Sequence, residues 1–130
     1  MHRALVPQVD RPFAALIDDL EQRGLLDRVL VVLMSEFGRT PKINQRLGRD
    51  HWPEAWSLAL AGAGIRRGVV IGKTTDDGVW VDDSPYDVGD LFHTIYRALG
   101  VDADETSFVN KGQPLPIAHE SCSVIEEALA

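Results

Sequence analysis

The chain has 130 residues, of which 45% are apolar and 25% are charged, and these proportions are those of an ordinary globular protein. The net charge of −7 argues against a general nucleic-acid-binding surface, because contact with phosphates needs a basic one. The single cysteine, Cys122, excludes an internal disulfide and every cysteine-based zinc motif. No apolar run approaches the length of a membrane span, and no export signal is recognisable. We therefore expect one soluble domain over residues 1–130.

The charge is unevenly distributed along the chain. Residues 37–75 carry a net charge of +5, so the remaining residues carry −12. A basic central segment in an acidic protein indicates a local site for an anion, and a solvated loop is the alternative.

The first predicted element is an amphipathic helix from Asp10 to Gly24. Asp10 is a suitable N-cap, Pro12 lies in the first turn, and apolar residues follow at helical spacing. Residues 29–34 then form an apolar run rich in β-branched side chains, which is typical of a strand covered on both faces of a parallel sheet. A helix that leads into such a strand indicates an α/β layer fold.

The middle of the chain alternates loops and short apolar runs. Residues 35–54 lack periodicity and predict a long loop at the carboxyl end of the first strand, where ligands gather in open α/β sheets. Residues 56–61 predict a second core strand, parallel to the first and next to it. Shorter strands are expected at 69–72 and at 79–81, the latter as an edge or hairpin strand.

The clearest predicted helix runs from Ser84 to Gly100. Ser84 is the expected N-cap, a proline follows at the first helical position, and Asp87 supplies an acid at the third. Residues 102–116 are polar and contain prolines, and the last residues predict a weak terminal helix.

Two motifs in the loop at 35–54 hold the side chains best suited to chemistry. They are Ser35-Glu36-Phe37-Gly38-Arg39-Thr40-Pro41 and Gly48-Arg49-Asp50-His51-Trp52-Pro53. Glu36, Asp50 and His51 offer oxygen and nitrogen ligands suited to a divalent metal such as Zn, Mn or Mg. Their spacing matches no short metal motif, so a structural role for His51 stays open.

Arg39 and Arg49 flank these candidate ligands. Guanidinium groups bind phosphate or sulfate in a bidentate manner, and the alternative is that both arginines pair with Glu36 and Asp50. We interpret His93 as structural and assign no role to the remaining histidines, to Cys122, or to the hydroxyls of the two motifs. These hydroxyls lack a local base.

These motifs, with Ala61-Gly62-Ala63-Gly64-Ile65, Val70-Ile71-Gly72 and the predicted helix at 90–100, resemble the carboxyl-terminal part of a bacterial family, domain-of-unknown-function family 1501. That family is related to the alkaline phosphatase and sulfatase superfamily. The resemblance covers roughly residues 10–120 and implies a partial alkaline-phosphatase-like layered fold, with a mainly parallel sheet flanked by helices. Members are usually several times longer and begin with a twin-arginine export signal, so this chain resembles the last third of such a protein.

The resemblance also implies a site. Active members of the superfamily hold metal with an Asp-His pair at a strand end and with a later histidine. Glu36 lies at the position of that aspartate, Phe37 replaces the adjacent histidine, and His51 resembles the later one. A divalent metal (Zn, Mn, Mg or Ca) bound by Glu36, Asp50 and His51 is the implied cofactor.

Two functions follow from this resemblance and stay open. The chain is part of a metal-dependent hydrolase of phosphate or sulfate esters, inactive in isolation, with Arg39 and Arg49 binding the small anionic ester. Alternatively, it is a non-catalytic binding or structural module of the same fold. In both cases a missing amino-terminal half or a second copy of the chain is expected to complete the fold.

Overall fold

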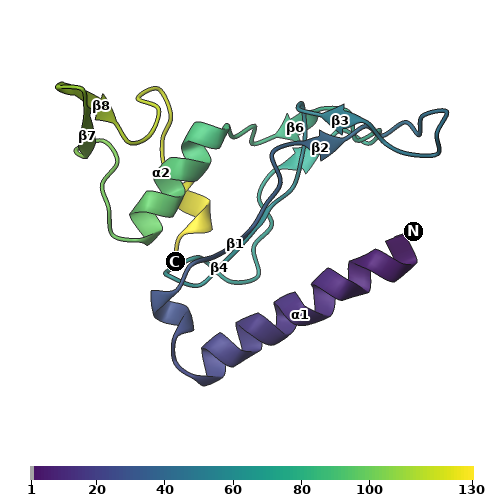
Figure 1. Ribbon diagram of the computed structural model, residues 1–130, viewed down its shortest axis with the longest axis horizontal. Helices are drawn as coiled ribbons and strands as arrows, with labels where there is room; N and C mark the ends of the chain where they lie inside the picture. The colour runs from purple at the N-terminus through teal and green to yellow at the C-terminus, as the bar shows by residue number, and fades with distance from the viewer. Residues whose placement is uncertain (1) are drawn as a thin grey trace.

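The computed structural model describes the backbone of residues 2–130 and the side chains of residues 5–130 (Figure 1). Its helical elements are α1 (His2–Gln22), η1 (Leu26–Arg28), α2 (Val88–Ala98) and η2 (Glu126–Ala128), of which the two η elements are single 3₁₀ turns. Its strands are β1 (Val31–Leu33), β2 (Gly38–Arg39), β3 (His51–Trp52), β4 (Ala59–Ala61), β5 (Lys73–Thr74), β6 (Val81–Asp83), β7 (Ser107–Asn110) and β8 (Gln113–Pro116). No helix of this part of the chain is long and apolar enough to cross a membrane.

The predicted α/β fold, with a mainly parallel sheet flanked by helices, is wrong. Within residues 2–130 the strands form separate two-stranded antiparallel sheets. β1 and β4 are neighbours, as predicted, but they run antiparallel, with Val31 opposite Ala61 and Leu33 opposite Ala59. Parallel strands need a crossover connection, usually a helix. The chain between β1 and β4 instead folds back through the hairpin β2–β3, so β4 returns in the opposite direction.

Helix α1 is longer than the sequence predicted, because it begins at His2 and not after Asp10. It therefore contains Pro7 and Pro12, each of which removes one backbone hydrogen bond from the helix. The predicted end at Gly24 is confirmed. The Gly24 amide donates to Glu21 O at 2.9 Å and the next amide donates to Leu20 O at 2.8 Å, which is the Schellman pattern of a helix end.

Helix α2 begins later than the sequence predicted. Asp87, and not Ser84, is its N-cap: the Asp87 carboxylate accepts from the backbone of the first turn, and Asp90 accepts from the Asp87 amide at 2.7 Å. This reciprocal pair is a capping box. Ser84 instead has φ +50° and lies in the turn after β6. The buried face of α2 is mixed, with Leu91, His93 and Thr94 buried, whereas the apolar side chains of Val88, Phe92 and Leu99 are exposed.

Several shorter elements also differ from the predictions. The loop predicted at 35–54 contains the hairpin β2–β3, and the polar segment at 102–116 contains the hairpin β7–β8. Residues 69–72 form no strand, whereas the hairpin expected near 79–81 is present as β5–β6. The terminal helix is reduced to the turn η2, which the buried Thr94 hydroxyl anchors by accepting from the Ile125 amide at 2.9 Å.

The segment before α2 is also joined to η2 by a contact between side chains. The Tyr86 hydroxyl donates to the Glu127 carboxylate at 2.7 Å. This hydrogen bond raises the pKa of Tyr86 and lowers the pKa of Glu127 from its ordinary value of 4.5. Because the folded pKa of Glu127 is the lower one, the contact stabilises the fold above pH 4.5, and this stabilisation is lost as the pH falls through the folded value.

Tyr86→Phe is therefore expected to return the pKa of Glu127 toward 4.5. The measurement is a carboxyl ¹³C NMR titration of the folded protein. Tyr96→Phe is the matched control, because the Tyr96 hydroxyl does not bond Glu127 in the described structure. A Glu127 pKa unchanged by Tyr86→Phe would contradict this contact between the segment before α2 and η2.

Candidate functional site

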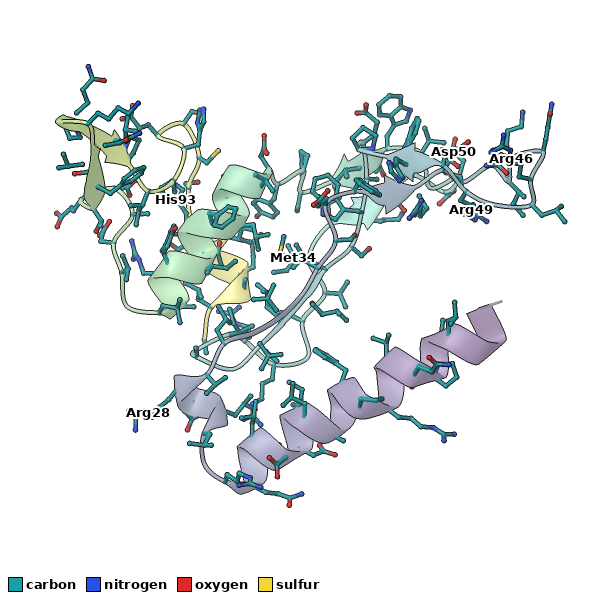
Figure 2. All side chains as sticks on the ribbon, in the orientation of Figure 1. Arg28, Met34, Arg46, Arg49, Asp50 and His93 are labelled. Carbon is teal, nitrogen blue, oxygen red and sulfur yellow. The ribbon has the colours of Figure 1, made fainter. Side chains whose placement is uncertain are left out.

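The candidate site residues lie on and around the hairpin β2–β3, at the end of the molecule farthest from η1 (Figures 1 and 2). In this hairpin Arg39 is directly opposite His51, and Gly38 is directly opposite Trp52. Directly opposite residues share one face of a hairpin and interact. The two predicted motifs are therefore joined by strand pairing, which places the Cα atoms of Arg39 and His51 opposite each other.

The ring of Phe37 organises this face. It stacks on the His51 imidazole, with ring centroids 3.8 Å apart and an angle of 26° between the planes. The Arg39 guanidinium carbon lies 5.4 Å from the centroid of the same ring, within the range of a cation–π contact. Phe37 therefore gives the imidazole and the guanidinium a shared apolar support.

Gly38 allows the hairpin to pack closely on the chain that follows it. A Cβ atom at this position would lie 2.0 Å from the Ala55 carbonyl oxygen and 3.1 Å from that of Trp52. Trp52 in turn donates its indole N–H to Val79 O at 2.7 Å, and its ring meets Trp80 edge-on with centroids 6.0 Å apart. These contacts hold the hairpin β2–β3 against the hairpin β5–β6.

Arg49 and Arg39 also stabilise the hairpin through backbone carbonyls. Arg49 Nη1 donates to Thr40 O at 2.7 Å and also to Pro41 O, and Arg39 Nη1 donates to Arg49 O at 3.3 Å. The alternative that these arginines pair with Glu36 and Asp50 is not what the described residues show, because neither forms an ion pair there. Both side chains are exposed, and each uses only one of its nitrogen atoms in these contacts.

Asp50 belongs to the structure of the loop that joins the two strands. Its carboxylate accepts from the Asn44 amide group at 2.8 Å, and the Asn44 carbonyl oxygen accepts the amides of Arg46 and Gly48 at 2.9 and 3.0 Å. Asn44 therefore organises the loop, a role that the sequence analysis missed. The signal in the sequence was weak: an asparagine, Asn44, is followed four positions later by a glycine, Gly48, and both residue types favour turns.

The structure does not bring the three predicted metal ligands together within this chain. Glu36 and His51 are both exposed, and no ion pair within 4.0 Å joins the imidazole to Glu36 or Asp50 among the described side chains. No cluster of three or more His, Cys, Asp or Glu side chains that can hold a metal ion is found in the described part of the chain. The metal site stays a prediction from the resemblance.

A second group of polar side chains lies beside the first turn of α2. His93 is 3% exposed and its Nε2 lies 3.0 Å from His119 O, while Ser121 Oγ lies 2.9 Å from His119 Nδ1. Cys122 packs so closely on Gly89 that a Cβ there would lie 2.3 Å from its sulfur. The sequence analysis assigned no function to these residues, and their contacts hold the carboxyl-terminal segment on α2 (Figure 2).

Comparison with known families identifies the chain. The family described as "Protein of unknown function (DUF1501)" matches residues 1–129. The chain belongs to the DUF1501 family. No curated protein and no solved structure matches it. The family predicted from the two motifs is thereby confirmed, and the hairpin β2–β3 of this DUF1501 chain is the part that carries both of them.

Proposed function

We propose that the hairpin β2–β3 binds the anionic group of a phosphate or sulfate ester, as the carboxyl-terminal part of a hydrolase-like DUF1501 protein. The observation that supports this most is the placement of Arg39 directly opposite His51. Their Cβ atoms are therefore about 5 Å apart, so both side chains can reach one tetrahedral oxyanion. Residues 38–52, which form the two strands and the loop between them, carry four basic side chains and one acidic one, a net charge of +3 that favours an anion at this hairpin.

Each residue of the hairpin has a distinct part in this proposal. Arg39 presents its unused nitrogen atoms to two oxygens of the anion, because a guanidinium matches that geometry. His51 donates from its ring to a third oxygen, and Phe37 keeps the imidazole plane fixed by stacking. Arg49 holds the loop through the carbonyls of Thr40 and Pro41 and adds positive charge.

Under this proposal, residues 1–130 alone bind the anion but do not hydrolyse the ester. A catalytic zinc site uses three protein ligands, and the described part of the chain holds no group of three or more His, Cys, Asp or Glu side chains placed to bind a metal ion. We therefore derive no step through a metal. A divalent ion (Zn, Mn, Mg or Ca) at these residues requires further ligands from outside residues 1–130, and the nucleophile is expected to come from there as well.

A non-catalytic structural module is the second candidate. It is favoured by the hydrogen bonds from Arg39 and Arg49 to backbone carbonyls of their own hairpin. If the chain is such a module, Arg39→Ala lowers the stability of the hairpin. It does not change anion binding, because the unaltered protein binds no anion.

The test is calorimetric titration of the protein with inorganic sulfate and with inorganic phosphate at low ionic strength. We expect saturable binding that Arg39→Ala weakens at least about tenfold, since a charge-assisted hydrogen bond contributes about 1.5–3 kcal/mol. Arg28→Ala is the control, because Arg28 is exposed in η1 at the opposite end of the molecule (Figure 2). Equal weakening by both variants, or no saturable binding, would favour the structural module.

A further inference from the structure

The loop at the free end of the hairpin β2–β3 carries two basic side chains that the proposed anion site does not use. Lys42 and Arg46 are both exposed, and neither forms an ion pair within 4.0 Å among the described side chains. Their hydrogen bonds in the loop are made by backbone atoms. Figure 2 shows Arg46 at the tip of the hairpin, beyond Arg49 and Asp50. Both charges are therefore available to a ligand.

The loop that carries these charges has a defined backbone. The Asn44 amide donates to Gly48 O at 2.8 Å, and the Leu47 amide donates to Asn44 O at 3.0 Å. The Asn44 side chain closes the loop from within, because it accepts the amides of Arg46 and Gly48. These bonds hold Leu47 at φ +60°, which costs a residue with a side chain about 1–3 kcal/mol. The loop therefore presents Lys42 and Arg46 from fixed backbone positions.

The acidic side chains next to the loop have partners of their own. The Asp50 carboxylate accepts from the Asn44 side chain at 2.8 Å. Asp77, in the turn of the neighbouring hairpin β5–β6, accepts from the Thr75 hydroxyl at 2.6 Å and from a backbone amide of its own turn at 3.1 Å. Residues 38–52 keep a net charge of +3, whereas the rest of the chain carries −10. The hairpin β2–β3 is therefore a basic projection on an acidic protein.

We infer that the loop at 41–49 is a second anion subsite, and that the ligand of the hairpin β2–β3 is a chain-like molecule with repeated sulfate or phosphate groups. One anionic group lies at Arg39 and His51, and a second lies at Lys42 and Arg46. A single group held between Arg39 and His51 leaves the two charges of the loop without a partner, and a second group of the same molecule supplies it. This inference rests on the proposed function, because it extends the same site.

Calorimetric titration with polymeric anions tests this inference. Dextran sulfate and linear inorganic polyphosphate are the probes, and inorganic sulfate and phosphate are their single-group references. We expect at least one polymer to bind at least about tenfold more tightly, per anionic group, than its reference, because the second group binds at a millimolar effective concentration. A gain with only one polymer identifies the class of ester. No gain with either polymer, while inorganic sulfate binds saturably, would overturn the second subsite and leave the proposed function standing.

The double variant Lys42→Ala/Arg46→Ala separates a built subsite from general attraction. We expect it to remove the gain of the polymer. It should change the affinity for inorganic sulfate less than about threefold at about 0.15 M ionic strength, where the Debye length is about 8 Å. Arg28→Ala/Lys111→Ala is the matched control, because it removes the same charge from exposed positions in η1 and in the turn between β7 and β8. Equal losses of polymer binding in both double variants would overturn the inference, since any basic surface attracts a polyanion through counterion release.

Discussion

Gly62→Ala is expected to lower the free energy of unfolding by about 2–5 kcal/mol. Gly62 has φ +83°, and a Cβ atom there would lie 2.1 Å from Val29 O and 2.5 Å from Leu26 O. Both neighbours are backbone atoms, so neither can move away as a flexible side chain can. The substitution therefore separates the end of β4 from the chain that leads into β1. Urea unfolding followed by circular dichroism measures the change.

Gly64→Ala separates the two causes of this loss. Gly64 has φ +81°, but nothing lies within 4 Å of the Cβ that alanine would add. Its expected cost is therefore only the backbone strain of about 1–2 kcal/mol. Equal losses for Gly62→Ala and Gly64→Ala would contradict the close packing of Gly62 on the segment before β1.

Gly38→Ala is expected to cost about 1–3 kcal/mol of stability and to abolish anion binding. The added Cβ would lie 2.0 Å from Ala55 O, so β2 must shift relative to the chain after β3. That shift moves Arg39 away from its position opposite His51, and the proposed anion site depends on this pairing. Urea unfolding and sulfate titration of the same protein measure the two effects.

Gly48→Ala is the matched control in the same hairpin. The nearest atom to an added Cβ is Asn44 Oδ1 at 3.6 Å, and Gly48 does not have a positive φ. We expect a change within about 0.5 kcal/mol and unaltered sulfate binding. Sulfate binding by Gly38→Ala as tight as that by Gly48→Ala would mean that the hairpin register does not form the site.

The helix ends were predictable from the sequence because they depend on local chemistry. Both predicted closing residues, Gly24 and Gly100, end their helices with positive φ. The starts were less accurate. Helix α1 extends through Pro12 and Pro7 back to His2. Asp87 competes successfully with Ser84 because Asp90 completes its capping box.

Strand direction was not predictable in the same way. Residues 29–34 are apolar throughout and residues 56–61 are apolar except for Ser57, which suggested strands buried in a parallel sheet. The parts that pair, β1 and β4, are shorter and antiparallel, and their side chains are half-buried or exposed. An apolar run predicts that both faces of a strand are buried. It does not predict whether the neighbouring strand runs parallel or antiparallel.

The sequence did not predict the geometry of the segment that holds the candidate site residues. Arg39 and His51 were assigned to different groups, of anion-binding and metal-binding residues, because nothing in their spacing reveals that β2 and β3 pair. Phe37 was interpreted only as the loss of a metal ligand, whereas its ring supports His51. Pairing register depends on contacts between distant residues, which single-residue chemistry does not encode.

NMR of the ¹⁵N-labelled chain during titration with sulfate tests the proposed anion site most directly. We expect saturable shifts at the Arg39 side-chain nitrogen and at the His51 ring nitrogens, with a common dissociation constant. The Arg28 side chain, at the other end of the molecule, is expected to shift only with ionic strength (Figure 2). Shifts at Arg28 that match those at Arg39, or shifts at Arg39 without a response from His51, would contradict a shared site on the hairpin β2–β3.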